Sequence, residues 1–416
     1  MENGRNKTTQ SAQLGIYAMT MIGIGYAITI NNFTVGANAG LHLTFSKGII
    51  AIFIAWICLS LVWIFSGMMG AITHKNAAII FRHLFGSKGG IIPSLCTAFC
   101  NWVWAVFDYW YVGSVFRNMF PDHPTAAFIF GIALIVCIVI IGVIKDITSL
   151  KWLTALTVPV SLILFLVILV TVVIRCGGLE TFLAYQPTEE ISLFLAINML
   201  FGSFIAASGA FSDITYSAKS KRAVIIAMPI SMAVVCFQFL VAQFGAIGLA
   251  CVDLTSLALS LGGAIFYVIN FFVILGQSNT SPSSSLIIVT QISETFHIPR
   301  IVIVFIQPIV AGFLSCCVEF WFDVTLLNSL ANVTSLLFGP LLAAMFCEFY
   351  VIRRAKLDFE ETLPKFSAAG ILAVLLGMLL GIYLTYFCPI STPISIITFV
   401  FAFVVHYILR KAVKLR

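Results

Sequence analysis

Charged side chains are scarce in this sequence. Only 9% of its 416 residues are Asp, Glu, Lys or Arg, whereas 61% are hydrophobic, and the mean hydropathy is +1.10. A soluble domain carries about 25% charged residues, because its surface must be hydrated. Sixteen acids and 22 bases cannot hydrate the surface of a chain of this size. The composition therefore excludes a soluble globular protein, and we expect a lipid bilayer to cover most of its surface.

The sequence also lacks the residue clusters of a metal site or an active site. The cysteines lie mainly in apolar runs, with no CxxC pair and no histidine cluster beside them. The six histidines stand in predicted loops or at span ends. A membrane-embedded enzyme needs a His, Cys or acid constellation at depth, so we expect no enzymatic activity, no cofactor and no metal centre of this kind.

Long apolar runs fill most of the chain. A bilayer core about 30 Å thick requires roughly 20 apolar residues in a helix. That length predicts an all-α membrane protein with twelve spans. They are expected near residues 14–40, 48–73, 91–116, 125–144, 152–174, 191–214, 223–250, 262–291, 301–319, 321–350, 367–387 and 394–409. Polar residues interrupt the eighth run around Ser278–Ser285, and the ninth and tenth meet at Glu319–Asp323.

The bases predict the orientation of these spans. If the N-terminus is cytoplasmic, 19 of the 22 Lys and Arg residues fall on the inner side, and only Lys47, Arg117 and Arg175 fall outside. Cytoplasmic loops of membrane proteins carry such an excess. We therefore expect a multi-pass protein of the cell membrane with both termini in the cytoplasm. The net charge of +6 then reflects orientation, and we expect no nucleic-acid partner.

Two spans contain clusters of small residues. The first contains Met21-Ile-Gly-Ile-Gly-Tyr26 and the sixth Phe204-Ile-Ala-Ala-Ser-Gly209. Glycine also serves close helix packing in membranes, so each cluster alone is ambiguous. Spans one and six, however, are equivalent positions in two inverted halves of five helices, and paired interruptions there are typical of discontinuous helices around a transport site. We expect a tail (1–13), a ten-helix inverted-repeat core (14–350), and two further helices with a cytoplasmic C-terminus (351–416).

The third span carries polar and aromatic residues at depth. Trp104 lies about thirteen residues into the span, with Asn101 on the same helical face and Asp108 one turn further on. The indole ring could stack on a flat ligand, or it could belong to an interfacial belt. A buried acid pairs, protonates or faces water, so Asp108 is a functional candidate and a possible proton site, with a structural hydrogen bond as the alternative.

The eighth span carries Gly276-Gln-Ser-Asn-Thr-Ser-Pro-Ser-Ser-Ser285, the most polar stretch at depth. Hydroxyl and amide oxygens are the ligands that hard cations prefer. The alternative is a polar lining without an ion, and composition does not separate the two.

These segments resemble the cytosine/purine permease branch of the nucleobase–cation symporter family, whose fold is the LeuT-type five-plus-five inverted repeat. The similarity is carried by the stretch from Gly202 to Lys219, by Pro93-Ser-Leu…Trp104, and by Phe338-Gly-Pro…Glu348-Phe-Tyr-Val-Ile-Arg-Arg354, and it extends over most of the chain. The resemblance implies a permease with a small nucleobase-like substrate and a sodium ion or proton as the coupling ion.

Carried over residue by residue, the resemblance implies a substrate site. The stacking Trp of the third helix falls on Trp104, the aromatic of the sixth on Phe204, and a polar contact on Asn101. The broken sixth helix would add backbone groups around Ser208 and Gly209.

The resemblance also implies a sodium site. A glycine whose carbonyl helps to bind sodium falls on Gly23, with Tyr26 one turn on. Ser278 and Asn279 stand where the family has a pair of threonines.

The sequence departs from the family elsewhere. Leu275 stands where cytosine permeases have an Asn that contacts the substrate, although a one-residue gap would bring Gln277 there instead, and Ala206 replaces a Ser. We therefore expect a secondary active transporter that imports a nucleobase or related planar heterocycle with a cation. The alternatives are an amino-acid or amine transporter of the same fold and, less favoured, a membrane enzyme.

Overall fold

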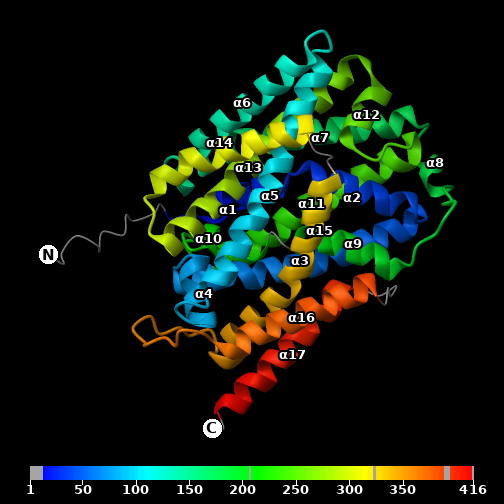
Figure 1. Ribbon diagram of the computed structural model, residues 1–416. Coiled ribbons are helices and arrows are strands. Elements are labelled where there is room, and N and C mark those ends of the chain that lie inside the picture. Colours follow the sequence, from blue (N-terminus) through cyan, green and yellow to red (C-terminus); the bar gives the residue numbers. More distant parts are fainter. Residues whose placement is uncertain (1–12, 206–207, 322–324, 388–393, 415–416) are drawn as a thin grey trace.

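The computed structural model describes residues 13–205, 208–321, 325–387 and 394–414, and side chains are described throughout these ranges except at 325–335 and 413–414. This part of the chain is built from helices, without a strand, and one isolated bridge pairs Leu14 with Ala218. Figure 1 shows the helices packed into one bundle.

The helices run in the following order. They are α1 (Ile16–Ala27), α2 (Ile30–Leu41), α3 (Phe45–Thr73), α4 (Ala77–Phe85), α5 (Ile91–Met119), α6 (Pro124–Val143), α7 (Ile147–Arg175), α8 (Leu179–Leu183), α9 (Leu193–Ile205), α10 (Ser212–Thr215), α11 (Lys221–Leu249), α12 (Leu254–Leu261), α13 (Gly263–Phe296), α14 (Arg300–Trp321), α15 (Thr325–Phe346), the π-helical turn η2 (Cys347–Ile352), α16 (Ala368–Tyr386) and α17 (Ile394–Lys414).

Nine helices of the described residues are long and apolar enough to cross a membrane: α3, α5, α6, α7, α11, α13, α14, α16 and α17. The predicted first and sixth spans consist of shorter pieces, α1 with α2 and α9 with α10. The predicted tenth span consists of α15, which has 22 residues, followed by η2. The polar boundary expected at Glu319–Asp323 lies partly outside the described residues, since 322–324 are not among them.

The first span is discontinuous, as predicted, but its break lies beyond the expected glycines. Helix α1 ends at Ala27 and α2 begins at Ile30, with Ile28 and Thr29 in extended conformations. Gly23 and Gly25 lie within α1, where an added Cβ would stand 2.3 Å from Ser231 Oγ and 2.7 Å from Thr154 Cγ2, respectively. These glycines therefore allow α1 to pack closely against α11 and α7, and the helix ends one turn later.

The sixth span is also discontinuous, as predicted. Helix α9 ends at Ile205 and α10 begins at Ser212. The carbonyl of Ser208, between them, accepts a hydrogen bond from the Ser66 hydroxyl, and the Thr215 hydroxyl donates to the carbonyl of Gly67 at 2.8 Å. Hydroxyl groups of one span thus bond backbone carbonyls of the other near the break. Such bonds are needed because a bilayer offers no water to irregular backbone.

The polar residues of the eighth span do not interrupt the helix. Helix α13 is continuous from Gly263 to Phe296, with Pro282 inside it. Several of its polar side chains donate to carbonyls four residues earlier: Ser278 to Ile274 at 2.7 Å, Asn279 to Leu275 at 2.9 Å, and Ser283 to Asn279 at 2.9 Å. Because these groups are satisfied within the helix, a polar composition does not require a break here.

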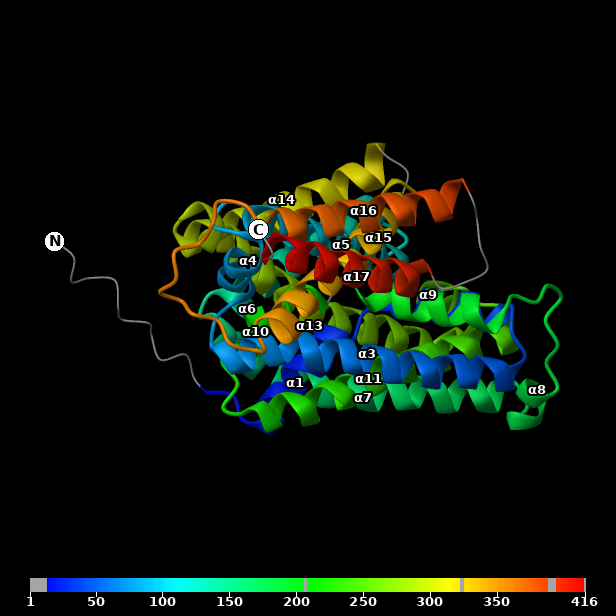
Figure 2. The same ribbon diagram turned by 90° about the horizontal axis from the view of Figure 1, so that it is seen from below.

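The two ends of the bundle are built differently. Figure 2 shows α4, α10 and the connection before α16 at one end, here called the α4 end, and α8 at the other. At the α4 end, Leu14 pairs with the chain after α10, and Lys88 N donates to the carbonyl of Lys365 at 2.9 Å. Arg300 bonds Asp146 at 2.9 Å at this end as well. The segments predicted to be cytoplasmic therefore meet at one end of the bundle.

Candidate functional site

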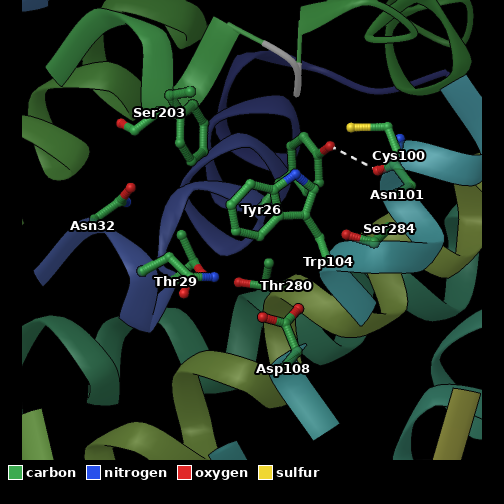
Figure 3. A pocket seen from close by; sticks show the side chains of 12 residues that line it. Tyr26, Thr29, Asn32, Cys100, Asn101, Trp104, Asp108, Ser203, Thr280 and Ser284 are labelled. Atoms are coloured by element: carbon green, nitrogen blue, oxygen red, sulfur yellow. Dashed lines mark hydrogen bonds between the residues drawn. The ribbon is translucent and has the colours of Figure 1, made fainter. Parts of the chain in front are cut away.

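A cavity lies at mid-depth where the two broken spans meet α5 and α13. The space between its lining atoms is about 490 Å³, a volume that includes the part open to solvent. Five residues expected at the site line it: Tyr26, Asn101, Trp104, Asp108 and Phe204. Figure 3 shows Tyr26 from α1, Trp104 and Asp108 from α5, and Thr280 from α13 around this space. The structure thus brings three of the predicted substrate residues, Asn101, Trp104 and Phe204, together with Tyr26 of the predicted cation site and the possible proton site Asp108.

Aromatic rings form two parts of the cavity wall. On the α9 side, the ring of Phe204 stacks on Trp63 with centroids 5.4 Å apart, and Tyr26 lies 6.4 Å from Phe204. On the α5 side, half-buried Trp104 packs against Phe107 at 5.7 Å. Trp104 and Phe204 thus belong to separate ring clusters that face the same cavity. Two aromatic faces on different helices are suited to holding a flat ring.

Asn101 is held in a fixed orientation. Its Oδ1 accepts a hydrogen bond from the Tyr26 hydroxyl at 3.0 Å (Figure 3), and its Nδ2 donates to the carbonyl of Thr97 at 3.0 Å. Both Asn101 and Tyr26 are buried, with exposed fractions of 4%. The pair connects α1 to α5 and leaves on Asn101 one further lone pair that can face the cavity.

Asp108 is buried with an exposed fraction of 1% and lines the cavity. Its Oδ2 accepts from the Ser281 hydroxyl at 3.4 Å, and no described residue donates to Oδ1. Gln277 lies near this carboxyl group, but its amide meets the geometry of a hydrogen bond with no described residue. In Figure 3 the carboxyl group points toward Thr280 and Trp104. Asp108 is thus a buried acid with an unused acceptor at a cavity.

The break of the first span brings carbonyl oxygens together around Thr280. The Thr280 hydroxyl lies 3.2 Å from the carbonyl oxygen of Gly25 and 3.3 Å from that of Gly276, and it also bonds the carbonyl of Ile28. A hydroxyl has one proton to donate, so these carbonyls retain acceptor capacity. Several oxygen atoms therefore converge at the point where α1 ends beside α13.

Two amides hold the other side of the break. Asn32 Nδ2 donates to the carbonyl of Ala27 at 3.0 Å and to Gln238 Oε1 at 2.7 Å. Gln238 Nε2 in turn reaches the carbonyl of Thr29 at 3.4 Å. These hydrogen bonds from α2 and α11 stabilise the extended residues Ile28 and Thr29. The cavity is lined here by Thr29, Asn31 and Asn32.

The other predicted site residues lie away from the cavity wall. Gly23 packs against Ser231 of α11, and Ser278 bonds within its own helix. Asn279 accepts a hydrogen bond from Thr157, and its Cβ lies 3.4 Å from the position of a Cβ built on Gly25. Ser208 and Gly209 are buried after α9. Ala206 lies outside the described residues.

Sequence reasoning missed several residues of the wall. Thr280 and Ser284 line the cavity and stand four residues apart, so they share one face of α13. That spacing was a usable signal within the polar run. Trp63, which supports Phe204 from α3, gave no such signal, because it lies in an apolar stretch like many others.

Comparisons of sequence identify relatives. No family model matches the chain. Cytosine permeases of Escherichia coli K12 and of Escherichia coli O157:H7 are each 24% identical to it over 267 residues, which is 61% of this chain and 60% of the relative. The chain thus matches about three fifths of the length of these curated relatives.

Comparisons of structure identify the fold. A nucleobase-cation-symport-1 family transporter, MHP1, in a closed conformation with bromovinylhydantoin bound, has a TM-score of 0.79 and 16% identity, covering 96% of this chain and 91% of that one. A Na⁺-coupled sialic acid symporter has a TM-score of 0.72 and 14% identity, covering 97% and 91%. The chain therefore has the LeuT-type fold of these membrane transporters, and both comparisons support its assignment to the nucleobase–cation symporters.

Proposed function

We propose that this relative of the cytosine permeases is a secondary active transporter that imports a nucleobase or similar planar heterocycle together with a cation. The observation that carries the proposal is the cavity at the two broken spans, with Trp104 and Phe204 in its wall. Broken helices at equivalent positions of two repeats are the usual surroundings of a transporter's midplane site. The relatives are permeases and symporters by name, which points to transport rather than to an enzyme.

The aromatic residues would hold the ring of the substrate. A flat heterocycle that stacks on Trp104 gains about 1–3 kcal/mol from the contact. Phe204, supported by Trp63, would contact the ring from α9. Asn101, fixed by Tyr26, would contact an edge of the ring through its remaining lone pair. Ser208 and Gly209, between α9 and α10, would approach the substrate when the sixth span moves, and Gln277 of α13 would approach it beside Asp108.

The coupling ion would bind where α1 ends beside α13. The carbonyls of Gly25, Ile28 and Gly276 and the hydroxyl of Thr280 offer hard oxygen ligands to a sodium ion. Asn279, next along α13, could add its amide oxygen. Three of these ligands stand two residues after a predicted one: Gly25 after Gly23, Ile28 after Tyr26, and Thr280 after Ser278. The reason is that α1 ends at Ala27, one turn beyond Gly23.

Such an ion would link binding to the membrane potential. One charge that moves down a potential of about 100 mV releases roughly 2.3 kcal/mol, which is sufficient for about fortyfold accumulation. The α4 end would face the cytoplasm, in keeping with its bases.

An uptake screen in proteoliposomes tests the proposal. Labelled nucleobases and labelled amino acids would be supplied with a sodium gradient, with a pH gradient in sodium-free buffer, and with neither. We expect nucleobase uptake that saturates with sodium. Uptake of amino acids alone would favour the amine-transporter alternative, for which Asp108 could bind an ammonium group. Uptake driven by the pH gradient without sodium would assign the coupling to a proton.

A further inference from the structure

A second pocket lies at the α4 end, apart from the cavity at the broken spans. It is enclosed by the end of α4, by the connection 353–367 that leads to α16, and by α17. The space between its lining atoms is about 890 Å³, a volume that includes the part open to solvent. Ser87 N donates to the carbonyl of Pro364 at 2.9 Å, and Ser367 N donates to that of Phe85 at 2.7 Å. Backbone hydrogen bonds therefore hold the connection in place over this pocket.

The first turn of α16 forms one wall of the pocket and has unpaired N–H groups. Ser367, Ala368 and Ala369 line the pocket, and the side chain of Ser367 does not cap the helix. The N–H groups of Ala368, Ala369 and Gly370 have no acceptor among the described residues, although Ala369 is only 5% exposed. Free N–H groups and the helix dipole together make such a helix N-terminus attractive to an anion.

His83 of α4 is a second unpaired group in this wall. The residue is 9% exposed, and its Nδ1 lies 2.9 Å from the carbonyl oxygen of Ile79, one turn earlier in the same helix. Nε2 therefore lies on the side of the ring away from that carbonyl, and it has no partner among the described residues. The ring of Phe359 contacts the imidazole edge-on, with centroids 4.7 Å apart, and holds it in place. A buried ring nitrogen without a partner is unfavourable, so a ligand that bonds Nε2 would be stabilised here.

Two arginines of the wall have donors to spare. Arg353 donates from Nε to Glu348 at 3.0 Å and from Nη1 to Glu361. Arg410 donates from Nε and Nη2 to Glu348, at 3.0 and 2.8 Å. A guanidinium group has five N–H donors, so Nη2 of Arg353 and Nη1 of Arg410 keep N–H groups that no described residue accepts. The pocket therefore offers donors to a ligand with several acceptor oxygens.

We propose that this pocket binds a phosphate group, which is carried either by a soluble phosphate ester or by the headgroup of an anionic lipid at the α4 end. The three free oxygens of a phosphate ester point in different directions, so they can accept from the first turn of α16, from Arg353 and from Arg410 together. A protonated phosphate oxygen can also donate to His83 Nε2, which an ionised carboxylate cannot do. Glu361 repels the ligand and limits its affinity.

Binding of labelled phosphate to full-length protein in detergent tests the inference. Equilibrium dialysis at constant ionic strength would measure the affinity. Arg353→Lys keeps the charge but loses the planar fork and its spare donors, so the affinity should fall about tenfold. His83→Phe keeps an aromatic ring against Phe359 but removes Nε2, and it should lower the affinity by about threefold or more. Glu361→Gln removes a negative charge from the wall, so the affinity should rise by about threefold or more.

The matched control is Arg354→Lys, which makes the same chemical change at an exposed neighbour outside the wall and should leave the affinity unchanged. Displacement of labelled phosphate by glycerol 3-phosphate and by phosphatidate in mixed micelles, with phosphatidylcholine as the reference, distinguishes the soluble source from the lipid. Whichever acts at the lower concentration is the favoured ligand.

Two results would overturn the inference. The first is that wild type retains neither labelled phosphate nor labelled phosphatidate. The second is that wild type and Glu361→Gln bind with equal affinity while Arg353→Lys, folded by thermal unfolding, also binds as tightly. Because Glu361→Gln should strengthen binding, a misfolded variant cannot imitate its effect. Nucleobase uptake tests the proposed function separately, since none of these substitutions alters the cavity at the broken spans.

Discussion

The cavity and the α4 end both bury carboxyl groups, but these groups are surrounded differently. At the α4 end, Asp213 is 1% exposed and accepts from Ala77 N at 2.7 Å and from Gln291 Nε2 at 2.5 Å. Asp108 is equally buried but has one oxygen without a donor among the described residues. Burial alone therefore does not indicate function, whereas the partner atoms around each buried acid distinguish a structural connection from a binding group.

Glu348 is the most fully paired acid of the α4 end. It is 1% exposed and bonds Arg353 at 3.0 Å, Arg410 at 2.8 Å and His406 at 3.0 Å. These contacts attach η2 to the start of the connection toward α16 and to α17. Asp213 likewise connects α10 to the first turn of α4 and to α13. At the α4 end, ion pairs and hydrogen bonds thus satisfy the buried carboxyl groups. At the cavity, Asp108 keeps an acceptor oxygen available to a ligand.

The largest expected effect is on stability at the α4 end. Glu348→Ala leaves Arg410 and His406 without their acid partner and Arg353 with Glu361 alone, and breaking such a buried network costs about 3–5 kcal/mol of unfolding free energy. Asp108→Asn should cost far less, because no ion pair is lost. Thermal unfolding of both variants in detergent measures the difference. Similar losses of stability in both variants would show that the two acids are equivalent and would contradict the comparison.

The next effect concerns binding at the cavity. Trp104→Ala removes the stacking surface on α5, and we expect up to about a hundredfold loss of nucleobase affinity with little change in stability. The matched control is Trp110→Phe on the same helix, whose indole bonds Glu319 at 2.8 Å away from the cavity. Isothermal titration gives the affinities. Wild-type affinity in Trp104→Ala would mean that this ring serves packing alone.

A third prediction compares two hydroxyls on α13. Thr280 contacts carbonyls of the broken span, while Ser278 bonds only its own helix. Thr280→Val should raise the sodium concentration for half-maximal uptake by about tenfold or more, since it removes an oxygen ligand. Ser278→Ala should have a smaller effect on the same value. Uptake at varied sodium and constant pH measures both, and the reverse order would favour a site that includes Ser278.

The smallest effects test which end faces the cytoplasm. Thr188 and Ser220 are both exposed, and they lie near α8 and at the start of α11, toward opposite ends of the bundle. A cysteine at Thr188 should react with an impermeant thiol reagent applied to intact cells, and one at Ser220 only after permeabilisation. Neither change should alter uptake. The opposite labelling pattern would reverse the orientation of the α4 end.

Local sequence was sufficient to predict much of the fold and part of the site. Helix lengths follow from apolar runs matched to the bilayer, and discontinuity at the first and sixth spans follows from their equivalent positions. Trp104, Asn101 and Asp108 were identified as candidates because their spacing on a single helix places them on one face. Such inferences involve one element at a time, so the chain order contains the necessary information.

Contacts between distant segments were beyond the reach of the sequence. Helix α1 continues through Gly23 and Gly25 because Ser231 and Thr154 pack against them, and it ends where Thr280 reaches the carbonyl of Ile28. These partners are more than 120 residues away along the chain. The polar run of α13 looked like an interruption, but hydrogen bonds within the helix keep it continuous.

The sequence by itself determined that lipid surrounds this protein, since 9% charged residues cannot hydrate its surface, and it correctly indicated discontinuity in the first and sixth spans. The tertiary structure decided where the break lies and which polar groups remain unpaired. Whether a buried acid is satisfied depends on the atoms that surround it in space. Asp213 meets Ala77 and Gln291, whereas Asp108 meets a cavity, and only the packing of α5 against α13 and the broken spans creates that difference.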